Sequence, residues 1–228
     1  MRESPRCGAV SRFESSYSAG MRVAAVAVVL ALAAAPAAAL EVTPVLALRL
    51  GVAPALGSAV ADLPIADTIP LQFPIQLDAL LGQGPLALGA YGSWGPAHAA
   101  KCGDASCSAW VARLGLQATW TFAVEGGGAP WVGLASGYEW AREHRTQGGT
   151  VTTTWAGWEP IAVQGGVEWR VLRWLALGPY GLVGVGRYSR YTVDTGFEQA
   201  SSAIPHQAIH AWIHLGVRGR FLIWGEPK

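Results

Sequence analysis

Hydrophobic and polar residues alternate with a period of two through most of the chain after residue 40. This alternation is typical of β-strands that have one apolar and one polar face. Eight segments show it, and each is close to the roughly 9–11 residues that a tilted strand needs to cross a bilayer. We therefore expect strands at about 41–53, 70–81, 85–94, 109–123, 131–143, 155–171, 175–191 and 207–224.

The segments between these strands alternate between long and short. Longer polar stretches lie at 54–69, 95–108, 144–154 and 192–206, and tight links lie at 82–84, 126–128 and 172–174. A meander with two unlike ends gives this order, and outer-membrane barrels have short periplasmic turns and longer outside loops. The pattern predicts an all-β, eight-stranded antiparallel up-and-down transmembrane β-barrel with surface-exposed loops and both termini in the periplasm. A short extra hairpin within 54–69 would make it ten strands, and the sequence leaves this open.

The composition decides which face of the barrel meets the surroundings. The chain is 51% hydrophobic and only 14% charged, whereas soluble domains carry about 25% charged residues. The two lysines, Lys101 and Lys228, lie outside the predicted strands, although strands that face water commonly use lysine against edge pairing. The apolar face therefore suits lipid, and the polar face suits a narrow interior. A soluble lipocalin-like ligand-binding barrel, which would bury the apolar face instead, is the alternative.

The N-terminal region has the features of an export signal. Met21-Arg22 precedes an apolar stretch at 23–35 and the small residues that end at Ala39, an order typical of a cleaved secretory signal peptide over 21–39. We expect 40–228 to be the mature barrel. Residues 1–20 are polar and precede a second methionine, so we interpret them as an over-extended N-terminus; a genuinely long leader is the alternative. No basic patch or like-charge run follows the signal, which argues against nucleic acid as a partner.

The chain ends in a pattern of its own, Gly219-Arg220-Phe221-Leu222-Ile223-Trp224. This segment resembles the C-terminal insertion signal of small eight-stranded outer-membrane barrels of the OmpA/OmpX type, and the resemblance extends over 40–228 at the level of architecture. It differs because residues 225–228 follow, whereas that family usually ends at the aromatic residue. The resemblance implies insertion by the barrel-assembly machinery of a Gram-negative bacterium, and contact with outer-membrane lipid and lipopolysaccharide. We expect the barrel to be monomeric.

Charged residues on the polar face are expected to fill the lumen. An eight-stranded barrel is just wide enough for side chains, and a buried charge without a partner costs several kcal/mol. We therefore predict two paired polar layers that act as a structural plug; a narrow ion or small-solute pore lined by the same groups is the alternative. The layer near the periplasm comprises Asp78, Glu168, Arg170, Arg218 and Arg220, and the one nearer the outside comprises Arg49, Arg113, Glu139, His210 and His214.

Two further groups of residues have predicted roles. Cys102 and Cys107 lie five apart in a loop of an exported protein, which favours a disulfide over a metal site that would have only His98 beside it. Aromatic residues on the apolar face are expected to form the two interfacial girdles of a membrane barrel. These are Trp110 and Trp140 at the long-loop end, and Trp120, Trp169 and Phe221 at the short-turn end.

No catalytic constellation stands out. Lipid-modifying outer-membrane hydrolases use a Ser/His/acid arrangement, and the chain has no G-x-S-x-G elbow. His206, with Ser201 and Ser202, lies in the last loop without an acid placed to orient it. We expect a non-enzymatic protein with no cofactor and no metal, in a structural or surface-interaction role. A lipid-modifying hydrolase is the remaining alternative.

Overall fold

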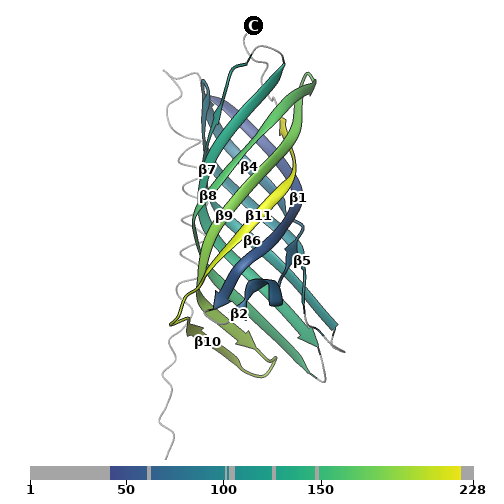
Figure 1. The fold of residues 1–228 in the computed structure, drawn as a ribbon, viewed down its shortest axis with the longest axis vertical. Helices are drawn as coiled ribbons and strands as arrows, with labels where there is room; N and C mark the ends of the chain where they lie inside the picture. Colours follow the sequence, from purple (N-terminus) through teal and green to yellow (C-terminus); the bar gives the residue numbers. More distant parts are fainter. Residues whose placement is uncertain are drawn as a thin grey trace, which may run out of the picture. The chain divides into compact units, whose positions relative to one another are not determined.

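A computed structural model of the chain describes residues 42–60, 63–100, 102, 106–124, 127–146 and 149–221. These residues form an antiparallel β-barrel (Figure 1). The predicted segments 1–20 and 21–39 and the last part of the C-terminal pattern, 222–228, lie outside the described residues and stay predictions. The elements are β1 Thr43–Val60, β2 Leu63–Pro64, the 3-10 helix η1 Ile65–Asp67, β3 Leu71–Gln72, β4 Ile75–Gln83, β5 Leu86–His98, β6 Ser106–Thr121, β7 Gly128–Thr146, β8 Thr150–Leu172, β9 Leu175–Asp194, β10 Gln199–Ala203 and β11 Ile209–Phe221.

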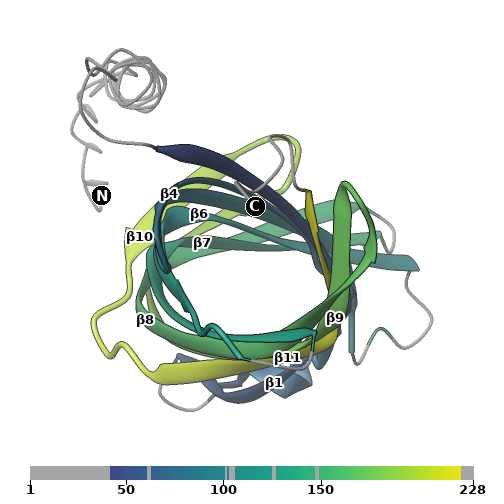
Figure 2. The ribbon, with the colours of Figure 1, turned by 90° about the horizontal axis from the view of Figure 1, so that it is seen from above.

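Eight strands close the ring, as the sequence predicted (Figure 2). Around the ring, β1 pairs with β3 and β4, which together occupy the position of one strand. These pair with β5, and pairing then continues in chain order through β6, β7 and β8 to β9. The ring closes because β11 pairs with both β9 and β1. Following the paired residues once around the ring from Ala55 leads back to β1 at Val45, ten residues away. Such a stagger tilts the strands by about 35–45° to the barrel axis and leaves an interior that side chains can fill.

The strands run further at the long-loop end than the sequence predicted. The expected loops 54–69, 144–154 and 192–206 contain the end of β1, the ends of β7 and β8, and the hairpin of β9 and β10. A short extra hairpin does occur in 54–69, because Val60 in β1 pairs with Leu63 in β2. Neither β2 nor β10 enters the ring, so the ten-strand alternative is wrong. At the opposite end, Gly84 adopts a φ of +58° in the tight turn after β4, a conformation that favours glycine.

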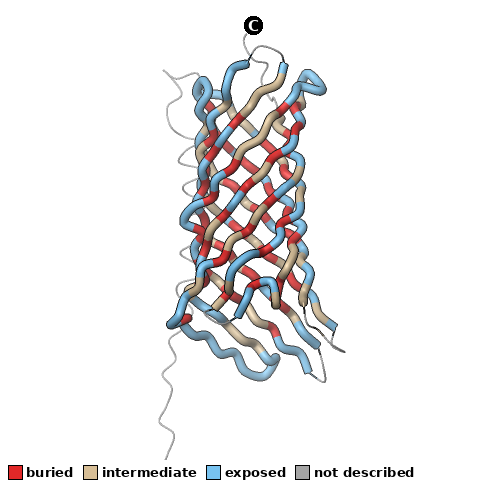
Figure 3. Tube along the Cα trace, in the orientation of Figure 1, coloured by how far each residue is buried: buried red, intermediate tan, exposed pale blue. Residues whose placement is uncertain are grey.

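Burial alternates along the strands with the opposite sense to that of a water-soluble barrel (Figure 3). In β6 the side chain of Leu116 is 61% exposed on the outside, while Gln117 is 4% exposed on the inside. The same order holds in β4, where Leu77 is exposed and Asp78 is buried. The described residues include no helix long and apolar enough to cross a membrane. The alternation of burial gives the barrel an apolar outer wall and a polar lumen.

Candidate functional site in the barrel lumen

The lumen contains two layers of paired charges, and the inner layer lies toward the short-turn end. We define the inner layer as Arg49, Asp78, Glu168, Arg218 and Arg220. Arg49 Nη2 lies 2.6 Å from Asp78 Oδ2, and Arg218 Nη1 lies 2.7 Å from Glu168 Oε1. Arg220 Nε donates to the second Glu168 oxygen at 2.7 Å, and Arg218 Nε is 3.6 Å from Asp78. Both carboxylates therefore bridge two strands or more.

Amide and aromatic side chains complete the inner layer. Arg49 donates to the Oε1 atoms of Gln117, at 3.0 Å, and Gln164. Gln76 Nε2 donates to Asp78 Oδ1 at 2.8 Å. The guanidinium groups of Arg218 and Arg49 also lie over the ring of Trp131, with their Cζ atoms 4.3 and 5.3 Å from its centroid. Because the charges are buried, these hydrogen bonds and ring contacts replace the hydration that they lose.

The outer layer is organised around the carboxylate of Glu139. Arg113 Nε donates to Glu139 Oε2 at 2.7 Å. The other oxygen, Oε1, accepts a hydrogen bond from Trp212 Nε1 at 3.2 Å and from the hydroxyl of Tyr188, and lies 3.2 Å from His210 Nε2. The Tyr188 and His210 rings stack with centroids 4.2 Å apart. Four elements of the ring, β6, β7, β9 and β11, thus meet at a single buried carboxylate.

A second carboxylate, Glu159, faces the same arginine. Its Oε2 lies 3.5 Å from Arg113 Nε, and its Oε1 accepts a hydrogen bond from Tyr91 Oη at 3.5 Å. A Cβ atom at Gly184 would overlap this carboxylate, and one at Gly186 would lie 3.0 Å from His210 Nε2. The two glycines of β9 therefore provide the space in which the outer layer sits.

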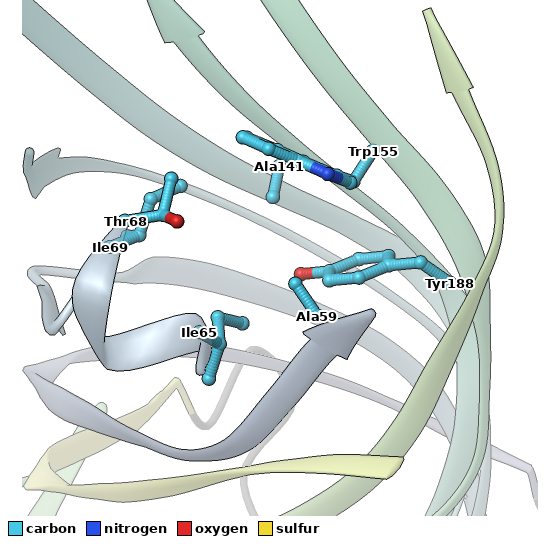
Figure 4. A pocket seen from close by; sticks show the side chains of 7 residues that line it. All are labelled: Ala59, Ile65, Thr68, Ile69, Ala141, Trp155 and Tyr188. Carbon is cyan, nitrogen blue, oxygen red and sulfur yellow. The ribbon is translucent and has the colours of Figure 1, made fainter. Parts of the chain in front are cut away.

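An apolar plug closes the lumen beyond the outer layer, at the long-loop end. Ile65, the first residue of η1, and Ile69, just after it, are 2% and 1% exposed and pack with residues of six ring strands and Ile204. A small recess, with no space for a water molecule, remains there and is lined by six residues of the plug and by Thr68 (Figure 4). Figure 4 shows Trp155 and Tyr188 on one side of this space and Ile65 and Ile69 on the other. The buried residues of the plug are Ala53, Ala55, Ala59, Ile65, Ile69, Ala109, Val111, Ala141, Trp155, Tyr188, Ile204 and Trp212.

Most of the predicted luminal residues are buried where the alternation placed them. Asp78, Arg113, Glu139, Glu168, His210, His214, Arg218 and Arg49 are each at most 4% exposed. Arg49 was assigned to the wrong layer, because its side chain pairs with Asp78 in the inner layer and not with the outer group. Arg220 is partly exposed but bonded to Glu168. Arg170, near the end of β8, is exposed.

Several residues of the site were missed by the sequence analysis. Trp212 has the same parity in β11 as His210 and His214, so the alternation could have found it. Glu159 has the opposite parity to Gln164 and Glu168, and it reaches the lumen because the β8–β9 register shifts between Trp158 and Ile161. The other missed members of the site are Gln72, Gln76, Tyr91, Gln117, Trp131, Gln164, Tyr180 and Tyr188.

The remaining predicted residues lie in the loops and on the outer wall. Cys102 and Cys107 form a disulfide, as predicted. Trp120 and Trp169 are exposed, and Trp110, Trp140 and Phe221 are partly exposed. Within the described ranges, no group of three or more His, Cys, Asp and Glu side chains is arranged to hold a metal ion.

The proposed hydrolase residues do not form a bonded triad in the described part of the chain. Ser201 Oγ is 3.1 Å from Thr192 Oγ1, and Ser202 Oγ donates to the Ala203 carbonyl at 3.3 Å. His206 is exposed and bonds to neither serine.

No protein-family model and no curated protein sequence matches the chain. Among solved structures, the chain resembles Neisserial surface protein A at 14% identity and a TM-score of 0.49, over 78% of this chain and 97% of that one. It resembles the outer membrane protein AlkL at 15% identity and a TM-score of 0.46, over 86% and 97% of the two chains. The outer membrane protease OmpT from Escherichia coli is similar at 6% identity and a TM-score of 0.42, over 79% and 93%. The chain resembles small outer-membrane barrels in architecture.

Proposed function

We propose that the chain is a non-enzymatic outer-membrane β-barrel with a structural or surface-interaction role, and that its lumen does not conduct. The observation that carries this proposal is the filled lumen. From one end to the other, the interior holds the inner charged layer, the outer charged layer and the apolar plug. Groups that are bonded to one another across the barrel act as rigid filling and leave no path for a solute.

The outer wall supports the membrane location. Apolar side chains from five different ring strands are each more than half exposed. These are Leu50, Leu77, Leu116, Val163 and Leu215. Soluble monomers rarely expose a continuous apolar surface of this kind. A closed ring also pairs the backbone groups of its strands internally, which lipid requires of any structure that spans it.

The first experiment tests the location. Cell membranes are fractionated, and the mobility of the unheated and heated protein is compared on a semi-native gel. We expect the protein in the outer-membrane fraction with a heat-dependent shift in mobility. A soluble protein without this shift would overturn the proposal.

The second experiment tests the closed lumen in planar lipid bilayers. The purified barrel is expected to give no steady channel openings, because the charges that line the lumen are paired. Steady openings in the wild type that disappear in Arg218→Ala would contradict the plug and favour the pore.

The surface-interaction role requires that the long-loop end faces outward. Phe197, in the β9–β10 hairpin, is 97% exposed, and Arg173 is exposed in the turn at the opposite end. The two native cysteines of the barrel are joined in a disulfide and do not compete for a thiol reagent. On intact cells, a membrane-impermeant maleimide should label Phe197→Cys and not Arg173→Cys. The reverse result would contradict the orientation.

A lipid-modifying activity is the alternative to a non-enzymatic role. A deacylation assay on the purified barrel, with His206→Ala as the control, distinguishes the two. We expect no turnover with either protein. Turnover that depends on His206 would overturn the non-enzymatic proposal.

A further inference from the structure

Three arginines interrupt the apolar outer wall, and all lie near the long-loop end. Arg142 in β7 and Arg187 and Arg190 in β9 are exposed. Among the described strand residues on that face, the one carboxylate is that of Asp194, at the end of β9, where it accepts a hydrogen bond from Gly196 N at 2.8 Å. The rest of the outward face is apolar or uncharged. The three cations therefore form a local feature, which we call the arginine patch.

The strand register brings the patch together on three adjacent strands. Across β7, β8 and β9, one row of outward residues is Tyr138, Trp158 and Arg187, and the next is Trp140, Ala156 and Arg190. Arg142 lies in the row above, opposite Thr154. A bulge around Ser189 lets both Arg187 and Arg190 point outward although they are three residues apart, because Gly157 pairs with Tyr188 and Ala156 with Arg190.

Aromatic side chains lie in the same rows of the sheet as Arg187 and Arg190. The rings of Tyr138 and Trp158 meet edge to face with centroids 5.4 Å apart, and those of Tyr138 and Trp140 are 4.8 Å apart. Trp158 is 58% exposed. Tryptophan and tyrosine gather where acyl chains meet lipid headgroups. In a membrane-embedded barrel, the arginine patch thus lies at the headgroup level of the leaflet on the long-loop side.

The patch arginines have no protein partner among the described residues, unlike the arginines of the lumen. Arg49, Arg113 and Arg218 each lie within 2.7 Å of a carboxylate oxygen. No ion pair or hydrogen bond joins the side chain of Arg142, Arg187 or Arg190 to another described residue. A guanidinium group binds phosphate through two parallel hydrogen bonds, and it is the side chain of choice for that ligand.

We propose that the arginine patch binds the phosphate groups of a lipopolysaccharide molecule in the outer leaflet, with its acyl chains against Tyr138, Trp140 and Trp158. This inference rests on the proposed outer-membrane location and orientation. Three unpaired cations over an aromatic surface match a ligand that carries phosphates above several acyl chains. Each arginine at an anionic lipid surface contributes about fivefold to binding, so the three together contribute roughly 100-fold.

The test compares the triple variant Arg142→Gln/Arg187→Gln/Arg190→Gln with a matched control, Arg145→Gln/Arg173→Gln, which removes two exposed arginines elsewhere. Binding of purified lipopolysaccharide to the folded barrel in a zwitterionic detergent is measured by titration. We expect the triple variant to lose roughly 100-fold in affinity and the control to keep wild-type affinity. Dephosphorylated lipopolysaccharide should bind the wild type as weakly as the intact lipid binds the triple variant.

Three results would overturn the inference: equal affinity of wild type and triple variant, an equal loss in the control variant, or equal binding of phosphatidylglycerol and lipopolysaccharide by the wild type. The heat-dependent gel shift, recorded on the same samples, shows that each variant is folded. If the wild type lacks that shift and stays outside the outer membrane, the proposed function itself fails. If the shift is present and affinity does not depend on the patch, only this inference fails.

Discussion

The arginines inside the barrel and those on its outer wall differ in how their charge is paired. In the lumen, Arg49 and Arg113 are buried and bonded to carboxylates and amides from several strands. On the outside, Arg142, Arg187 and Arg190 are exposed and have no protein partner among the described residues. A buried charge must be paired within the protein, whereas a charge at the lipid interface can be paired by the surroundings. The inner arginines thus contribute to stability, and the outer ones are free to bind.

The largest effect on stability is expected when Glu139 loses its charge and its hydrogen bonds. Glu139→Leu leaves Arg113 with the longer contact to Glu159 and the hydrogen bond to Gln72, and it removes the acceptor for Tyr188 and Trp212. Breaking a buried ion pair by removing one partner costs about 3–5 kcal/mol. We expect a loss of that size in the free energy of unfolding, measured by denaturant titration of the barrel in detergent micelles.

Glu139→Gln is the matched control for this substitution, because it keeps the shape and an acceptor oxygen while it removes the charge. Its loss of stability should be smaller than that of Glu139→Leu. The folded fraction of both variants is followed by the heat-dependent gel shift. Wild-type stability in Glu139→Leu would show that the outer layer does not hold the strands together.

A smaller effect is expected from Arg49→Met in the inner layer. Asp78 would keep Gln76 as a donor at 2.8 Å and Arg218 at 3.6 Å, so the carboxylate would not be left without a partner. The methionine fills part of the space over Trp131. The loss should be about 2 kcal/mol, the scale of hydrogen bonds to a charged group, measured in the same titration. A loss equal to that of Glu139→Leu would mean that Asp78 depends on Arg49 alone.

The period-two alternation was sufficient to predict the ring, because each strand must present an apolar face to one side and a polar face to the other. It predicted the burial of His210 and His214 in β11 and the exposure of Leu215 between its neighbours. The strand ends at the long-loop side were not predicted. There β7 and β8 continue as a hairpin beyond the predicted apolar belt, and polar residues such as Thr153 and Thr154 occur on both faces. Without an apolar face the alternation disappears, although the backbone pairing persists.

The site was predictable only as far as the strand register was regular. Glu159 precedes Pro160 in the irregular part of β8. Odd-numbered residues after this bulge, such as Ile161 and Val163, face outward, whereas the side chain of Glu159 before it faces the lumen. Proline within a sheet is found at such irregularities, so Pro160 is a local signal that the period had shifted. The placement of Arg49 failed for another reason. Arg49 lies directly opposite Arg218 of β11 and Gln76 of β4, so the stagger between neighbouring strands puts it in the row of the inner layer. Neither the position of a bulge nor the stagger between strands is encoded in a simple alternation.

The smallest effect on stability is expected from Arg187→Gln on the outer wall. The side chain has no ion pair or hydrogen bond to the described residues, and glutamine keeps most of its length. Surface substitutions away from buried networks usually change the free energy of unfolding by less than about 0.5 kcal/mol. We expect a change of that size in detergent micelles without lipopolysaccharide, from the same titration that detects the luminal variants. Added lipopolysaccharide should stabilise the wild type more than Arg187→Gln, because a ligand that binds only the folded barrel raises its stability in proportion to the logarithm of its affinity. Equal stabilisation of the two proteins would place Arg187 outside the binding surface, while a large loss without the lipid would place it among the residues that hold the barrel together.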